Sequence, residues 1–139
     1  MTAPSALCID ETLWPIVVII PQGEISREAV GRYMIDIDRL LLRKQPQVYV
    51  FDGQQPYPFS MVACAEFAAA FRARRAILAQ YCVGAGVVFS NPLYAVAFAA
   101  YQKLYSSTYP TVRFSDMEAA LAWGRERLLF CGQVQPGHG

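Results

Sequence analysis

The polar residues best placed to do chemistry lie where an apolar segment ends and a helix is predicted to begin. Asp52 closes the run Val48–Phe51, and Ser60 opens an alanine-rich segment. Ligands of open α/β sheets collect at the carboxyl ends of strands, and the free amides of a helix N-terminus favour an anion such as phosphate. Two interpretations stay open. Ser60 carries a phosphate or only caps its helix, and Asp52 contacts a ligand or only holds its loop through backbone amides.

A second polar pair follows the next predicted strand. Ser90 and Asn91 would lie beside Asp52 in a parallel sheet and line a small crevice with it, although Asn91 before Pro92 is also a typical helix start. Residues 53–59 carry two prolines and cannot form regular structure. The candidate recognition loop consists of Asp52, Gln54, Gln55, Tyr57, Ser90 and Asn91.

Common catalytic and metal-binding patterns do not occur in the sequence. There is no G-x-S-x-G turn, no P-loop, and no G-x-G-x-x-G opening a helix. The four cysteines form no C-x-x-C pair, and the single histidine, His138, lies in the C-terminal tail. We therefore expect buried or half-buried thiols, no metal and no cofactor, and a protein that is not an enzyme.

An aromatic stripe distinguishes the predicted helix at residues 92–106. Its members recur at intervals of four, three and four residues, and Lys103 is the only charged residue of the helix. A surface helix normally has a polar face, so one side of this helix should cover the sheet and the other a partner. Tyrosine favours such interfaces, but an aromatic stripe is equally typical of a core. The candidate interface consists of Tyr94, Phe98, Tyr101 and Tyr105.

Composition narrows the class of partner. Hydrophobic residues make up 55% of the 139 residues and charged residues only 17%, against roughly 25% charged in an average domain. Either the core is unusually complete, or a second copy, a partner or a lipid covers apolar surface. A net charge of +1 gives no field to attract nucleic acid or an anionic membrane. No apolar run reaches the roughly 20 residues of a membrane span, and the first residues lack the basic segment of a signal peptide, so we expect a cytoplasmic protein.

Alternating strand and helix patterns predict the elements that position these residues. The order is β-β-α-β-α-β-α-β-α, a mostly parallel sheet of four to five strands with helices packed on it, the first two strands antiparallel at one edge. One domain should span residues 6–130, with 131–139 a disordered tail. Strands are predicted at 6–11, 15–21, 48–52, 82–89 and 111–114. Helices are predicted at 27–43 with Ser26 as N-cap, at 60–80, at 92–106, and after a capping box at Ser115 and Glu118.

This order of elements resembles the STAS and SpoIIAA-like family, the fold of anti-sigma-factor antagonists. The resemblance covers about residues 6–128 and rests on the hairpin Cys8–Ile20, the strand Val48–Asp52, Ser60, the strand Val83–Phe89, and the stretch from Phe114 to Trp123, which is similar to the ending of SpoIIAA-like proteins. The family's short Asp-Ser-Ser-Gly-type loop is replaced here by the longer segment 53–59.

The resemblance implies a non-enzymatic protein. In the family, a serine or threonine at the start of the second helix is phosphorylated in some members, and Ser60 matches that position. Our first hypothesis is therefore a protein-interaction module of bacterial signalling or regulation. It would self-associate as a homo-oligomer through apolar helix surface and be switched at Ser60. The alternative is a binding protein for a small hydrophobic molecule or lipid, to which SpoIIAA-like members have been linked. That alternative predicts an apolar cavity between the sheet and the helix at 60–80 or 92–106.

Overall fold

Runs of β-branched and apolar residues form the five strands of one mixed sheet. In a computed structural model that describes residues 7–23, 25–54 and 61–134, the strands are β1 (Leu7–Asp10), β2 (Ile16–Pro21), β3 (Gln47–Asp52), β4 (Cys82–Val88) and β5 (Thr111–Phe114). They lie in the order β1-β2-β3-β4-β5. The β1–β2 pair is antiparallel and every other pair is parallel, which confirms the predicted mixed α/β sheet.

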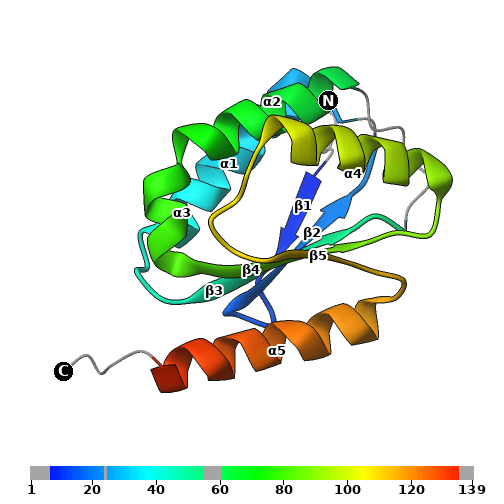
Figure 1. The fold of residues 1–139 in the computed structure, drawn as a ribbon. Coiled ribbons are helices and arrows are strands. Elements are labelled where there is room, and N and C mark those ends of the chain that lie inside the picture. Colours follow the sequence, from blue (N-terminus) through cyan, green and yellow to red (C-terminus); the bar gives the residue numbers. More distant parts are fainter. Residues whose placement is uncertain (1–6, 24, 55–60, 135–139) are drawn as a thin grey trace.

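Two unequal layers of helix cover the sheet. One layer contains α1 (Arg27–Leu41), α2 (Met61–Ala73), α3 (Arg75–Tyr81) and α4 (Pro92–Leu104), whereas α5 (Met117–Val134) lies alone against the other face (Figure 1). Strand side chains alternate between the layers. Val17, Ile19 and Tyr49 join the core under α1 and α2, and Val18 and Val50 join the core under α5. Among the described residues, no helix has the length and apolar character that crossing a membrane requires.

Local capping sets the helix starts, and one start differs from the prediction. The Ser26 hydroxyl accepts a hydrogen bond from the Ala29 amide at 3.2 Å, which confirms this N-cap. At the last helix the capping residue is Asp116 rather than Ser115, because the Asp116 carboxylate accepts from the Ala119 amide at 2.8 Å. Both residue types are good N-caps, and the sequence pattern placed the N-cap one residue too early. α5 then continues to Val134, beyond the domain boundary predicted at residue 130.

The helix predicted at residues 60–80 is wrong as a single element. It is interrupted at Arg74, whose backbone leaves the helical conformation. The Arg74 guanidinium pairs with Asp38 of α1 at 2.6 Å and also donates to the Ala70 carbonyl at 2.9 Å. Because these contacts draw Arg74 toward α1 and back onto the end of α2, α3 begins as a separate helix.

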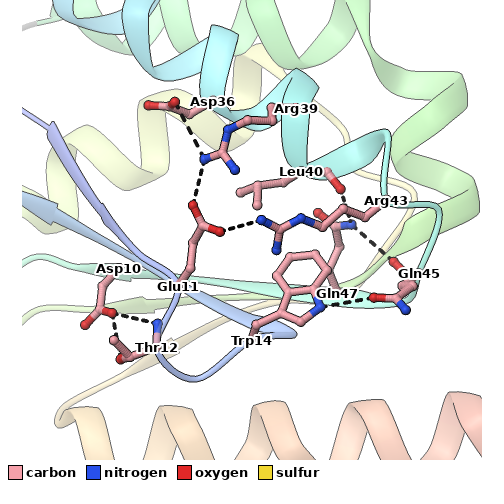
Figure 2. Close-up of polar contacts among 10 residues, drawn as sticks. All are labelled: Asp10, Glu11, Thr12, Trp14, Asp36, Arg39, Leu40, Arg43, Gln45 and Gln47. Carbon is pink, nitrogen blue, oxygen red and sulfur yellow. Dashed lines mark hydrogen bonds and ion pairs between the residues drawn. The ribbon is translucent and has the colours of Figure 1, made fainter.

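Charged and aromatic side chains fasten the β1–β2 hairpin to the end of α1 (Figure 2). Glu11 accepts from Arg39 at 2.6 Å and from Arg43 at 2.7 Å. The Arg43 guanidinium also lies 4.4 Å from the centre of the Trp14 ring, and Trp14 donates to the Gln45 side chain at 3.0 Å. The hydrogen bond from Arg39 is the main reason that the pKa of Glu11 lies below its usual value. Partly exposed pairs of this kind stabilise by at most about 1 kcal/mol each, so their role is to fix the register of the hairpin.

Close approach of backbones at the carboxyl edge of the sheet gives the first prediction. A Cβ atom at Gly53 would lie 2.6 Å from the Val88 carbonyl oxygen, whereas one at Gly31 of α1 would meet nothing within 4 Å. We expect Gly53→Ala to lower the free energy of unfolding by about 1–3 kcal/mol and Gly31→Ala to raise it by about 1 kcal/mol. Urea unfolding of both variants measures this. Equal effects would contradict the contact between β3 and β4 described here.

Candidate functional site

At the carboxyl edge of the sheet, the predicted polar residues make structural hydrogen bonds. Asp52 accepts from the Gln54 amide at 3.1 Å, and Asn91 accepts from the Leu93 amide at 2.9 Å. Asp52 is paired with Val88 in the sheet, so Asp52 and Ser90 do share this edge. Ser90 is exposed, and among the described residues no side-chain partner is assigned to it. The remaining predicted residues, Gln55, Tyr57 and Ser60, lie outside the described part of the chain.

Arg113 lies at the same edge and was not predicted. Its guanidinium donates two hydrogen bonds to the Phe89 carbonyl, at 2.7 and 3.2 Å, and lies 4.8 Å from the centre of the Phe89 ring. Both contacts hold Phe89 at the end of β4. A lone arginine in a short edge strand carries no sequence signal for this role.

The aromatic stripe of α4 faces inward, which agrees with the core alternative that the sequence left open beside the interface. Tyr94 and Tyr105 are buried and Phe98 and Tyr101 half-buried. Phe89 of the sheet packs against Tyr94 and Phe98, with ring centres 6.4 and 5.7 Å apart. The helix backbone itself packs against α2 and not closely against a strand. Large side chains therefore span the space between α4 and the sheet, and the exposed side of α4 carries Leu93 and Val96 instead.

A cavity of about 110 Å³ occupies the space under α4. Ala85 and Val87 border it and stay only half-buried, although β4 is a central strand covered by helices. Their small side chains and the distance of α4 leave the volume unfilled. Ten of the sixteen described lining residues are aromatic: Tyr33, Tyr49, Phe51, Phe67, Phe71, Phe89, Tyr94, Phe98, Tyr101 and Tyr109.

The described part of the cavity wall has polar atoms but no charge. None of the described lining residues is charged, and the polar side chains among them are tyrosines and Thr111. The Tyr49 hydroxyl donates to Gln47, a fully buried side chain that itself donates to the Leu40 and Gln45 carbonyls. Such a wall suits a neutral molecule, because a buried ion without a partner is strongly unfavourable.

Two thiols lie close to the cavity and are protonated at neutral pH. The Cys64 thiol donates to the carbonyl of Ala97, a lining residue, at 3.6 Å. Burial raises the pKa of Cys64 to about 11 and that of Cys82 to about 12. Burial likewise raises the pKa of Tyr33 and Tyr101. Since the reactive form of cysteine is the thiolate, these two thiols are not a nucleophilic centre.

Sequence reasoning identified Tyr94, Phe98 and Tyr101 but left open whether they face the core or a partner. Residues of α1, α2 and β3 line the other half of the cavity, among them Tyr33, Phe67 and Tyr49. Their sequence pattern is typical of an ordinary hydrophobic core. The available signal was composition, since 13% aromatic and 17% charged residues already indicated an excess of apolar side chains.

Comparison with protein-family models and with curated proteins finds no match to this chain. Within the part of the chain that the structure describes, no group of three or more histidine, cysteine, aspartate or glutamate residues could hold a metal ion. The aromatic cavity is therefore the candidate site, and its geometry is the basis on which function has to be argued.

A matched pair of substitutions tests whether the cavity is free volume. Ala97 borders the cavity, whereas Ala120 of α5 is fully buried in the core between α5 and the sheet. We expect Ala97→Leu to leave the free energy of unfolding unchanged or raise it by about 0.5–1 kcal/mol. Ala120→Leu should lower it by about 1–3 kcal/mol through overpacking. Urea denaturation of both variants is the measurement, and an equal loss in both would show that the space under α4 is filled.

Proposed function

We propose that this domain binds a small apolar molecule in the aromatic cavity and does not transform it. The observation that carries the proposal is a volume of about 110 Å³ whose described lining includes ten aromatic side chains and no charged one. Ligand sites are typically concave and mostly apolar, with a few polar groups that fix orientation. The lining has this composition and offers no ionised acid, base or nucleophile among its described members.

The energetic cost of unfilled space in a protein supports the binding of a ligand here. At about 24 cal/mol per Å³, a closed cavity of about 110 Å³ would correspond to roughly 2–3 kcal/mol of lost packing, and a volume that opens to solvent to less. A bound molecule restores these contacts. Apolar cavities of about 150 Å³ stay dry and bind benzene or xenon, so a cavity of this size suits a molecule of about one ring and not a long acyl chain.

The resemblance to the SpoIIAA-like group also supports the proposal. The resemblance rests on the order of elements, and the antiparallel first pair of strands followed by parallel strands is compatible with it. Some members of the group have been linked to hydrophobic ligands. We infer membership of this group from the order of elements and propose apolar-ligand binding as the role that it takes in this chain.

Titration with toluene tests the proposed function. We expect the wild-type protein to bind toluene with a Kd on the order of 0.1–1 mM, measured by isothermal titration calorimetry and by NMR shifts of resonances around the cavity. Ala97→Leu should abolish binding because it fills the site. Ala99→Leu, on the exposed side of the same helix, should bind as the wild type does. Absence of binding to the wild type would refute the proposal.

A second candidate function is a protein-interaction module of bacterial cytoplasmic signalling that self-associates. The observation that favours it is the outer side of α4, where Leu93 and Val96 are 77% and 65% exposed and lie one turn apart. Exposed apolar patches on monomers are often interaction sites. This surface replaces the aromatic stripe as the candidate interface and leaves the cavity for a ligand.

Sedimentation of surface variants tests self-association. The wild type should sediment as a dimer or larger species at high concentration, and the double variant Leu93→Ser/Val96→Ser should sediment as a monomer while keeping the same far-ultraviolet circular dichroism. Leu129→Ser, which removes an equally exposed leucine from α5, is the matched control and should behave as the wild type does. A strictly monomeric wild type would exclude this function.

A further inference from the structure

Two phenol groups of the cavity wall have no hydrogen-bond partner among the described residues. The structure assigns partners to the hydroxyls of Tyr49, Tyr105 and Tyr109. The Tyr33 and Tyr101 side chains make aromatic ring contacts, but their hydroxyls make no hydrogen bond to the described part of the chain. Tyr33 is nevertheless only 4% exposed, so an unpaired hydroxyl there needs an explanation.

The Tyr33 hydroxyl borders open space. No side-chain nitrogen or oxygen of the described residues is both fully enclosed and without a partner. An unpartnered hydroxyl on a buried residue must therefore retain some accessible area. Tyr33 and Tyr101 both line the cavity. The cavity is the space that both residues share.

We propose that the cavity is specific for a neutral, single-ring molecule of the phenol class, whose one polar group hydrogen-bonds to the hydroxyls of Tyr33 and Tyr101. The inference rests on the proposed function and adds the chemistry of the ligand. Each tyrosine hydroxyl can donate one hydrogen bond and accept others, so a ligand hydroxyl can accept from one phenol and donate to the other. The ring of the ligand then lies among the aromatic side chains.

The uncharged wall excludes the ionised relatives of such a molecule. Among the described lining residues no side chain could pair with a carboxylate or an ammonium group, and a buried charge without a partner costs several kcal/mol or neutralises. A purely apolar ring enters the site but leaves the two hydroxyls unpaired. Phenol, toluene and benzoate all carry one ring. Differences in their affinity for this cavity therefore report on the polar group alone.

The test is a calorimetric titration of the wild type, Tyr33→Phe and Tyr101→Phe with phenol, toluene and benzoate at pH 7. Tyr81→Phe removes a hydroxyl from a residue outside the cavity lining and is the matched control. We expect Tyr33→Phe and Tyr101→Phe each to weaken phenol binding about 3- to 10-fold and to leave toluene binding unchanged or tighter. Tyr81→Phe should change neither affinity. Benzoate should bind at least about 100-fold more weakly than phenol.

The outcomes separate this inference from the function on which it rests. If toluene binds the wild type but the ratio of phenol to toluene affinity is the same in both phenylalanine variants, the phenol-class inference is refuted and apolar-ligand binding stands. If benzoate binds as tightly as phenol, the inference is also refuted. If no ring compound binds, both proposals fail. Should one variant not fold, as judged by circular dichroism, the other carries the same comparison.

Discussion

The distance between α4 and the sheet is the constraint on which the rest of this structure depends. On the opposite face, α5 approaches the strands closely because its contact residues are small or face glycine. A Cβ atom at Gly124 would lie 3.2 Å from Val48, and one at Gly84 would lie 2.8 Å from the Trp123 ring. Under α4 the arrangement is reversed, because Tyr94, Phe98 and Tyr101 separate the helix from small residues of β4.

Large side chains on one wall and small ones on the other leave a volume that neither can fill. Protein interiors normally contain few voids larger than a water molecule, so a hollow of about 110 Å³ with an aromatic wall is an unusual feature of a domain of this size. The buried polar atoms nearby are well satisfied, with Gln47 bonded to two carbonyls and to Tyr49. The hydroxyls of Tyr33 and Tyr101, which have no hydrogen-bond partner among the described residues, stand out against that background and link the shape of the cavity to a chemical preference.

Much of the fold followed from local signals in the sequence. β-Branched runs predicted the strands, and the Ser26 and Asn91–Pro92 patterns predicted two helix starts. The break at Arg74 was not predictable, because an ion pair with Asp38 on another helix produces it. For α4 the sequence left the orientation open, since nearly every side of that helix is apolar and only packing against α2 decides which side is exposed. The sequence indicated an apolar cavity under the helix at 60–80 or 92–106 only as a consequence of the ligand-binding alternative, because a cavity depends on a gap between elements and not on a residue pattern. Predictions for Ser60, Gln55 and Tyr57 concern residues outside the described ranges and stay predictions.

Xenon binding tests the central claim most directly, because xenon is apolar, has no hydrogen-bonding group and enters dry cavities of this size. The measurement is ¹²⁹Xe NMR of the wild-type protein compared with Ala97→Leu. The account predicts a concentration-dependent xenon shift and perturbed resonances around Ala85, Val87 and Ala97 in the wild type, and loss of both in the variant. A wild-type protein that takes up no more xenon than the filled variant would contradict the existence of an accessible apolar site under α4.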